Sequence, residues 1–260
     1  MPLITLTTDF GLSDHYVGVI KGVILGLAPE ARLVDLCHQV EPYDVLGAAL
    51  TLAASYSWFP PQTVHLVVVD PGVGSARRPL LAQAGSWWFV APDNGALELV
   101  YRRHPHRVWA LRSEEFALQP ISNTFHGRDV FAPAAALLAR GAPPEQLGDP
   151  IADYARLPIP QPRESAPGRC QGAVLKVDHF GNLITNFQAA DLPTAFRITV
   201  GDARIHMLRP SYAAAAPGEI FAIAGSSGFL EISLNQDSAA RVLGVTAGAP
   251  VELVDTSRLE

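Results

Sequence analysis

The segment HLVVVDPGVGSARR, residues 65–78, decides the fold of this chain. It begins as an apolar, mostly β-branched run, which is typical of a strand buried on both faces of a parallel sheet. The run ends at Asp70, the turn residues Pro-Gly-Val-Gly follow, and Arg77 comes shortly after. Open α/β sheets bind their ligands at the carboxyl ends of such strands. The alternative is that Asp70 only caps its own turn.

The composition indicates a folded protein with a substantial core. The chain has 260 residues, of which 48% are hydrophobic and 17% charged, enough for one large domain or two ordinary ones. The net charge of −6 and the lack of any Lys/Arg run argue against binding to nucleic acid or to an anionic membrane.

Targeting and redox signals favour the cytoplasm. Met1 leads directly into a strand-like segment with no secretory signal, and the apolar runs are too short for a membrane span. The two cysteines, Cys37 and Cys170, lie far apart and form no CxxC pair, so we expect reduced thiols.

The first half of the chain alternates between strand and helix patterns. Ser13, Asp44 and a position near Asp129 are expected to begin helices, and Pro133 fits only a first helical turn. The expected strands are residues 3–7, 32–37, 63–69 and 108–111, with a hairpin over 80–90. This alternation predicts βαβ units, and therefore an α/β domain with a mainly parallel central sheet flanked by helices.

The pattern changes in the second half. Residues 142–168 are rich in proline and predict a surface linker with little regular structure. Short strands then follow, expected at residues 174–177, 183–187, 196–200, 205–208, 220–224 and 230–234. We therefore expect an α/β domain over residues 1–165 and a small antiparallel β-barrel domain over residues 169–260.

Four polar clusters follow these elements: Thr7–Asp9, Asp70, residues 123–129 and residues 178–182. If the first and third strands are neighbours, Asp9 and Asp70 face one crevice, where paired acids can hold sugar hydroxyls, hold a metal or supply a base. Each residue also has an ordinary structural interpretation. Asp is a common turn residue, His126 is suited to a helix cap or a core, and Asp178 can form an Asx turn.

Several known motifs are absent from the sequence. The chain has no P-loop, no dinucleotide-binding glycine motif after its first strand, no HExxH and no paired-cysteine zinc spacing. The serines also lack the context of a hydrolase nucleophile elbow.

Six motifs in order resemble one family. They are TTDFG (7–11), VVVDPGVGSARR (67–78), APDNG (91–95), FHGRDVFAP (125–133), DHFGNLITN (178–186) and SSGFLEISLNQ (226–236). On these motifs the chain resembles the S-adenosyl-L-methionine hydroxide adenosyltransferases, the S-adenosylmethionine hydrolases related to the fluorinase and chlorinase. The resemblance implies a homotrimer whose active sites lie between the first domain of one subunit and the second domain of a neighbour.

The resemblance also implies roles for individual residues. The catalytic set is Asp70, Arg77 and His126, which the halogenating relatives lack, so water is the implied nucleophile. The implied substrate contacts are Asp9 with the ribose, Asp178 with the methionine ammonium, Asn182 and Phe180 with the adenine, Ser226 with the methionine carboxylate, and Tyr212 and Glu231 as further contacts. Ser227 stands where fluorinase-type relatives have arginine, which weakens the carboxylate assignment.

The implied reaction is attack of water at the ribose C5′ of S-adenosylmethionine, giving adenosine and methionine without cofactor or metal. An arginine beside Asp70 should lower the pKa of that carboxyl and make it a poorer base. Two alternatives stay open: a metal-dependent hydrolase that uses Asp9, Asp70, Asp93 and His126, and a non-enzymatic protein that binds S-adenosylmethionine or adenosine.

Overall fold

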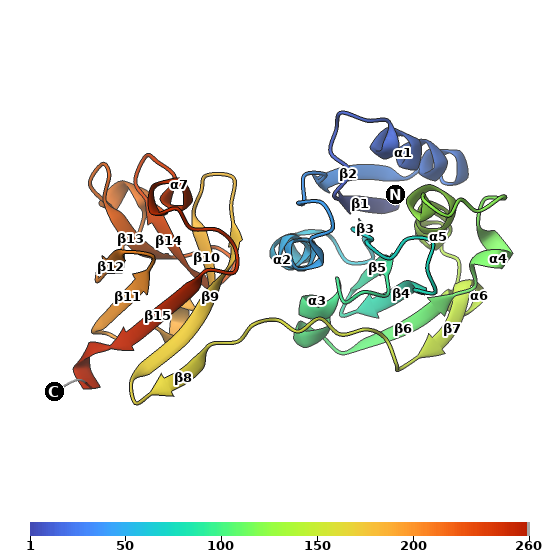
Figure 1. Cartoon of the computed structure of the whole chain (residues 1–260). Coiled ribbons are helices and arrows are strands. Elements are labelled where there is room, and N and C mark those ends of the chain that lie inside the picture. The colour runs from blue at the N-terminus through green and yellow to red at the C-terminus, as the bar shows by residue number, and fades with distance from the viewer. Residues whose placement is uncertain (259–260) are drawn as a thin grey trace. The chain divides into compact units, whose positions relative to one another are not determined.

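The structure is a computed structural model that describes residues 1–258, and it divides into two compact units between Leu157 and Pro158 (Figure 1). The first unit is a seven-stranded sheet with helices on both faces. The second unit consists almost entirely of strands. The expected α/β class with a β-barrel second domain is confirmed.

The sheet of the first unit has the order β2-β1-β3-β5-β4-β6-β7. Strands β2, β1, β3 and β5 pair in parallel, whereas β4, β6 and β7 are antiparallel to their neighbours. The strands are β1 (Leu3–Thr8), β2 (Arg32–Cys37), β3 (Val64–Val68), β4 (Pro79–Ala84), β5 (Trp87–Pro92), β6 (His106–Leu111) and β7 (Gly148–Ile151). Because β1 pairs directly with β3, the condition set by the sequence analysis is met, and Asp9 and Asp70 follow the carboxyl ends of neighbouring strands.

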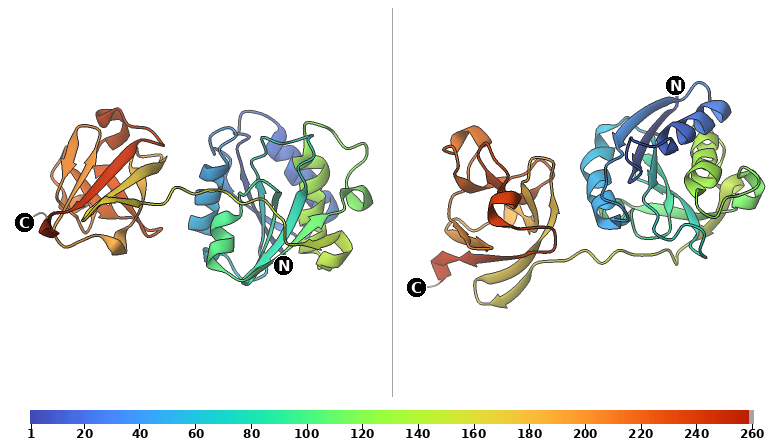
Figure 2. Two further views of the ribbon diagram at one scale, coloured as in Figure 1. Left: turned by 60° about the horizontal axis from the view of Figure 1, so that its bottom comes forward. Right: turned by 45° about the horizontal axis from the view of Figure 1, so that its top comes forward.

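Helices cover both faces of this sheet (Figures 1 and 2). One face packs against α1 (Tyr16–Leu27) and α5 (Ala132–Ala139), and the other against α2 (Val45–Ser55) and α3 (Glu98–Arg103). The short elements are the 3₁₀ turn Tyr56–Trp58 and the helices α4 (Ser113–Phe116) and α6 (Pro144–Leu147). Apolar strand residues are thus buried on both sides, which explains the unbroken Val/Leu run of β3.

The helix starts agree only partly with the sequence. The Asp44 carboxylate accepts the Gly47 N–H at 2.8 Å and caps α2, as expected. The prediction that Ser13 caps α1 is wrong. His15 occupies that N-cap without a side-chain hydrogen bond, because the turn after β1 continues further than the local pattern indicates.

The proline-rich stretch 142–168 is more ordered than predicted. It contains α6, β7 and β8 (Arg163–Ala166), and the two strands add to existing sheets by pairing with β6 and β9. Edge strands of this kind form backbone hydrogen bonds and tolerate proline, so they show little apolar periodicity.

The segment after β7 is fastened to the first unit by side-chain ion pairs. Arg78 Nη1 donates to Asp153 at 3.1 Å, and Arg156 donates to the buried Glu98. Arg78 also donates to Asp93, whose other carboxylate oxygen accepts the Ala155 N–H at 2.6 Å. Asp93 is therefore a structural anchor for this segment.

The second unit is an antiparallel sheet of eight strands that curls into a nearly closed barrel. Its order is β12-β11-β15-β9-β10-β14-β13, with β8 paired to β9. Besides β8, the strands are β9 (Arg169–Val177), β10 (Leu183–Gln188), β11 (Phe196–Val200), β12 (Ala203–Ile205), β13 (Ile220–Ala224), β14 (Phe229–Leu234) and β15 (Pro250–Asp255). Helix α7 (Ala239–Leu243) lies between β14 and β15.

The barrel closes where Met207 O and the Arg209 N–H bond to Ala222 of β13. The expected strand over residues 205–208 therefore ends at Ile205. The central strand β15 is absent from the sequence prediction.

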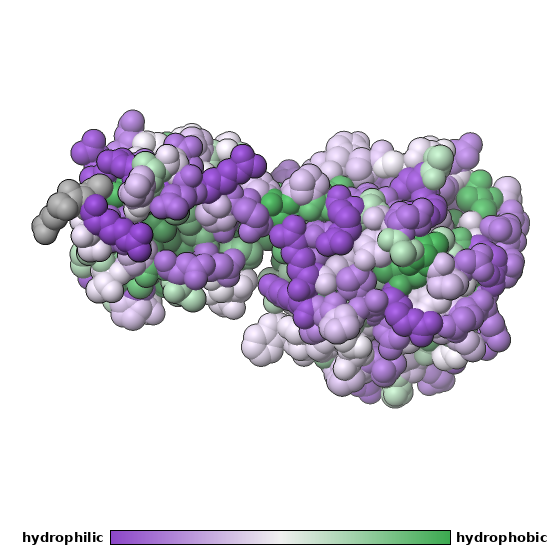
Figure 3. All heavy atoms as spheres, turned by 90° about the horizontal axis from the view of Figure 1, so that it is seen from below, coloured by the Kyte–Doolittle hydropathy of each residue, from purple (hydrophilic) through white to green (hydrophobic). Residues whose placement is uncertain are grey.

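On the face drawn in Figure 3, hydrophilic residues predominate and the apolar patches are small. Within residues 1–258, no helix has both the length and the apolar character needed to cross a bilayer.

Candidate functional site

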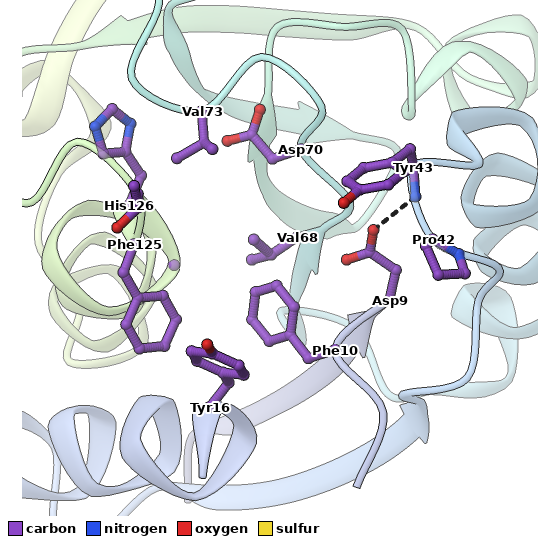
Figure 4. A pocket seen from close by; sticks show the side chains of 12 residues that line it. Asp9, Phe10, Tyr16, Pro42, Tyr43, Val68, Asp70, Val73, Phe125 and His126 are labelled. Carbon is purple, nitrogen blue, oxygen red and sulfur yellow. Dashed lines mark hydrogen bonds between the residues drawn. The ribbon is translucent and has the colours of Figure 1, made fainter. Parts of the chain in front are cut away.

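A cavity of about 320 Å³ lies at the carboxyl ends of β1 and β3 (Figure 4). Asp9 and Asp70 line it from adjacent strand ends, and His126 lines it from the opposite wall. Its other lining residues are Phe10, Tyr16, Pro42, Tyr43, Val68, Val73, Thr124, Phe125 and Gly127. This is the crevice that the strand-end argument predicts.

Arg77 links Asp70 to His126. One guanidinium nitrogen, Nη2, donates to Asp70 Oδ2 and lies 3.0 Å from His126 Nδ1. The side chains of Arg77 and Asp70 are only 7% and 6% exposed, so this is a buried ion pair. The structure thus brings together the three residues that the sequence predicts as a catalytic set.

The loop between Asp70 and Arg77 is held by its own hydrogen bonds. The Val73 N–H donates to Asp70 O, and the Ser75 hydroxyl both donates to Gly72 O and accepts the Arg77 N–H. These bonds fix the position from which the Arg77 side chain reaches Asp70.

Gly74 allows this loop to approach the segment before His126. It has a φ of +76°, and a Cβ atom there would lie 2.3 Å from the carbonyl oxygen of Asn123. Any other residue would push the two loops apart. Contact between Arg77 and His126 therefore depends on a glycine at position 74.

Burial and the ion pair with Arg77 act in opposite directions on the pKa of Asp70. Desolvation raises the pKa of Asp70 above its ordinary value, while the charge and hydrogen bond of Arg77 act in the opposite direction. Arg77 lowers this pKa as expected, but desolvation of the carboxylate outweighs that attraction, so the expectation that Asp70 is a poorer base is wrong. Asp70 is consequently a stronger base than an exposed aspartate.

His126 is held as a neutral imidazole. Burial lowers its pKa, and so does the nearby positive charge of Arg77. Because a guanidinium can only donate, the contact with Arg77 makes His126 Nδ1 an acceptor and places the ring proton on Nε2. The ring can therefore donate a hydrogen bond through Nε2.

A π-helical turn, Gly127–Phe131, directly follows His126 and leads into α5. Such turns are rare in proteins overall, but many of those that occur lie at functional sites. Asp129 within the turn is buried, and its carboxylate accepts the Ser122 N–H at 2.8 Å and the Arg128 guanidinium. These bonds fasten the segment that carries His126.

Asp9 is fixed from two sides. Its carboxylate oxygen Oδ2 accepts the Tyr43 N–H at 2.9 Å (Figure 4). Before it, the Thr8 hydroxyl contacts His38 Nδ1 at 2.9 Å and accepts the Phe10 N–H. Tyr43 has a φ of +68°, an unusual backbone conformation for a non-glycine residue and one that occurs most often at functional sites.

The first cavity also has an aromatic part that was not predicted from the sequence. Phe10, Tyr16 and Phe125 meet with ring centroids 5.2–5.9 Å apart. Tyr43, 73% exposed, lies on the side of the cavity that carries Asp9 (Figure 4). The sequence contains only a weak signal for them, since Phe10 directly follows one predicted polar cluster and Phe125 lies within another.

A second cavity of about 920 Å³ lies within the second unit. It is lined by every substrate contact predicted for that half of the chain: Asp178, Phe180, Asn182, Tyr212, Ser226 and Glu231. The other lining residues are Ile223, Ala224, Gly225, Leu234, Asn235, Gln236, Asp237 and Ser238.

The DHFGN motif forms one tight turn at this cavity. Asp178 Oδ1 accepts the N–H groups of Phe180 and Asn182, and its Oδ2 accepts the Asn182 side-chain amide at 2.9 Å. The structural interpretation of Asp178 as an Asx turn is thus correct, and the same residue also lines the cavity. The turn leaves the Phe180 ring 75% exposed.

Glu231 and Tyr212 contact each other at the second cavity. The Tyr212 hydroxyl donates to Glu231 Oε2 at 3.3 Å, and Glu231 is only 8% exposed. A Cβ atom at Gly225 would overlap the Glu231 carboxylate at 2.0 Å, so this glycine makes room for the acid.

The four side chains that a metal-dependent hydrolase would use as ligands do not come together. Asp93 is engaged by Arg78 and the Ala155 N–H instead of facing Asp9, Asp70 and His126. In the described part of the chain, no three His, Cys, Asp or Glu side chains form a group able to hold a metal ion.

Comparison with known families gives two matches. The family model described as the SAM hydroxide adenosyltransferase N-terminal domain matches residues 4–148, and the corresponding C-terminal domain matches residues 172–252. The matches fall in the first and second units respectively.

Individual relatives cover nearly the whole chain. An (R)-S-adenosyl-L-methionine hydrolase from Thermus thermophilus is 41% identical, covering 95% of this chain and 97% of its own length. A fluorinase from Nocardia brasiliensis is 29% identical, with coverage of 97% and 96%. A crystal structure of an uncharacterized conserved protein from Thermotoga maritima superposes with a TM-score of 0.89 at 36% identity, covering 97% of this chain and all of that one.

Proposed function

The chain belongs to the SAM hydroxide adenosyltransferase family, and from this membership we propose that it hydrolyses S-adenosyl-L-methionine to adenosine and L-methionine. We assign the R-sulfonium epimer as the preferred substrate, because the hydrolase relative is named for it. The observation that carries the proposal is the contact of the buried Arg77 with both Asp70 and His126 beside a cavity.

The proposed step is a displacement at C5′ of the ribose. The oxygen of water forms a bond to C5′, the C5′–S bond breaks, and its electron pair returns to sulfur. The leaving group is a neutral thioether, so no acid has to protonate it. The demand falls on the nucleophile, because water is weak and hydroxide is scarce at neutral pH.

The residues of the first cavity fit this demand. Asp70, with its raised pKa, accepts a proton or a hydrogen bond from the attacking water. His126 donates through Nε2 to the same oxygen, and the fixed charge of Arg77 stabilises hydroxide character as it develops. Asp70 Oδ1 and Arg77 Nη1 are buried without a hydrogen-bond partner among the described residues, which supports a polar ligand at this point.

We assign the binding of the rest of the substrate to both units. Asp9 holds the ribose hydroxyls, Phe180 and Asn182 hold the adenine, and Asp178 and Ser226 hold the methionine part. Tyr212 and Glu231 lie in the same cavity as the methionine contacts and are assigned as further contacts.

We propose that the complete site forms in a homotrimer, between the first unit of one subunit and the second unit of a neighbour. The division of the predicted residues between two separate cavities supports this arrangement. We further assign the protein to the cytoplasm, in keeping with the free thiols of Cys37 and Cys170.

Incubation of the purified protein with each sulfonium epimer in oxygen-18 water tests the reaction. We expect adenosine labelled at its 5′ oxygen, formed faster from the R epimer, and no 5′-halogenated product in excess chloride or fluoride. Unlabelled adenosine, a halogenated main product, or tight binding without turnover would each exclude the proposed hydrolysis.

A further inference from the structure

The second cavity has an unusual distribution of charge. Three carboxylates line it, from Asp178, Glu231 and Asp237, and none of its lining residues within 1–258 is lysine, arginine or histidine. The first cavity likewise has no lysine or arginine in its lining. Arg77, which contacts the lining residues Asp70 and His126, is 7% exposed and already paired with Asp70.

Two of the three carboxylates lack a cationic partner. Asp237 pairs with Arg241 at the surface. Asp178 accepts only amide N–H groups of its own turn, and Glu231 accepts only the Tyr212 hydroxyl, in the part of the chain that the structure describes. The second cavity is therefore built to receive positive charge.

Burial strengthens this preference. Glu231 is 8% exposed, and desolvation together with the neighbouring charge of Asp178 raises its pKa. A carboxylate removed from water without a counter-ion gains most from a cationic ligand that completes the pair. An ammonium group placed between Glu231 and Asp178 meets this need.

The carboxylate of a methionine ligand finds no comparable partner. The residues at the Ser226 end of the cavity, Ala224, Gly225 and Ser226, offer only neutral hydrogen-bond donors, and Ser227 after them is also uncharged. A carboxylate bound there gains neutral hydrogen bonds but sits near Glu231 and Asp178, whose like charges repel it.

We propose that the protein recognises the ammonium and sulfonium charges of its substrate but not the carboxylate, and that it also hydrolyses adenosyl sulfonium compounds that carry an ammonium and no carboxylate. This inference rests on the proposed hydrolysis of S-adenosylmethionine and widens its substrate class.

The chemistry of the step is unchanged for such a compound. The oxygen of water bonds to C5′, the C5′–S bond breaks, and the electron pair stays on sulfur. The water loses one proton to Asp70 and then to solvent. The products are adenosine and a thioether in which the sulfur is neutral and the ammonium group is unchanged.

Three substrates test the inference with the unmodified protein. They are S-adenosylmethionine, its decarboxylated form, and the S-adenosyl dimethylsulfonium that lacks both ammonium and carboxylate. We expect kcat/KM for the decarboxylated form to stay within about threefold of that for S-adenosylmethionine, since the carboxylate makes only neutral hydrogen bonds. Loss of the ammonium should lower kcat/KM by about 10- to 100-fold, because it removes charge-assisted bonds.

The outcomes separate this inference from the function on which it rests. If S-adenosylmethionine is cleaved and the decarboxylated form is cleaved about 100-fold more slowly, the inference is wrong and the hydrolase assignment stands. If neither compound is cleaved, the proposed function fails, and the inference fails with it.

A variant pair tests the assigned acid. Glu231→Gln should raise KM by about tenfold for the two substrates that carry an ammonium and leave the dimethylsulfonium unchanged. Glu252→Gln, on β15 of the same unit and outside the cavity lining, should change none of the three. An equal loss on all three substrates with Glu231→Gln would mean that the residue is only structural, and would overturn the inference.

Discussion

The cavity of the first unit and the cavity of the second are both lined by carboxylates, but their charges are satisfied differently. In the first, Asp70 is paired with a buried arginine that also contacts His126. In the second, the partners of Asp178 and Glu231 among residues 1–258 are all neutral donors. The first cavity holds the charge of Asp70 in a fixed internal pair, whereas the second leaves the charges of Asp178 and Glu231 available to a ligand.

This difference separates two tasks. A fixed ion pair beside an acceptor oxygen suits a chemical step, because its dipoles are already oriented before the transition state forms. Unpaired carboxylates in a larger cavity suit binding of a cation. We therefore expect substitutions in the first cavity to act mainly on kcat, and those in the second mainly on KM.

The largest expected effect comes from Asp70→Asn. The amide keeps the size of the side chain but loses its charge and its capacity to take a proton. We expect kcat to fall by about 10²–10⁴-fold, while adenosine binding changes much less. Steady-state kinetics and calorimetric titration with adenosine measure the two quantities.

Asp153→Asn is the matched control for Asp70→Asn. Asp153 pairs with the neighbouring arginine, Arg78, but its side chain is 79% exposed. We expect near-normal kcat for this variant. A similar loss in both variants, or a normal kcat for Asp70→Asn, would contradict the division of tasks between the cavities.

A mixing experiment tests whether the two cavities act together across subunits. Asp70→Asn damages only the first cavity and lowers kcat, and Asp178→Ala damages only the second and raises KM, so each protein alone should be nearly inactive when it is assayed well below the KM of the Asp178→Ala variant. After subunit exchange at equal amounts, half of the first units and half of the second units are intact. About a quarter of the shared sites in a trimer then pair two intact halves, and activity should recover to that level.

Exchange has to be shown independently, for example by mass spectrometry of differently tagged subunits. Recovery near a quarter would support sites shared between subunits. Demonstrated exchange without any recovery would place each complete site within a single chain.

The fold was largely predictable because its signals are local. The Val/Leu run before Asp70 and the turn after it identify a buried strand, and Asp44 identifies a helix start. The elements that were missed lack such signals. β7 and β8 are edge strands in a proline-rich stretch, and β15 is recognisable only through the strands with which it pairs.

The candidate site was predictable in its members but not in its geometry. Proximity of Asp9 and Asp70 follows from neighbouring strand ends, which sequence patterns indicate. The contact of Arg77 with His126 depends on two loops that meet at Gly74, and no local pattern shows that meeting. The raised pKa of Asp70 required knowledge of burial, because the sequence shows the arginine but not the loss of water.

The smallest expected effect concerns stability, where the two units also differ. His65 of β3 is completely buried, with Nδ1 2.7 Å from the Thr5 hydroxyl and its ring stacked on Phe89. Burial lowers its pKa from 6.5 to about 3. The histidines of the second unit, His179 and His206, are exposed.

Acid should therefore destabilise the first unit through His65. Below pH 6.5 the unfolded chain binds a proton at this residue, but the folded chain does not. The free energy of unfolding therefore falls as the pH decreases from about 6.5 toward about 3. One such proton contributes a slope of about 1.4 kcal/mol per pH unit. Urea unfolding, followed by tryptophan fluorescence between pH 7 and pH 4, measures that slope. All four tryptophans lie in the first unit, at positions 58, 87, 88 and 109, so the signal reports on this unit.

His65→Gln keeps a neutral hydrogen-bonding group but cannot take up the proton, so it should flatten the slope by up to this amount while lowering stability at pH 7. His206→Gln, in the second unit, controls for the replacement of an exposed histidine outside the unit that the tryptophan signal reports on. An unaltered slope in His65→Gln would show that His65 takes up no extra proton on unfolding, and the acid sensitivity of the first unit would then have to come from other groups, such as His126 and the carboxylates.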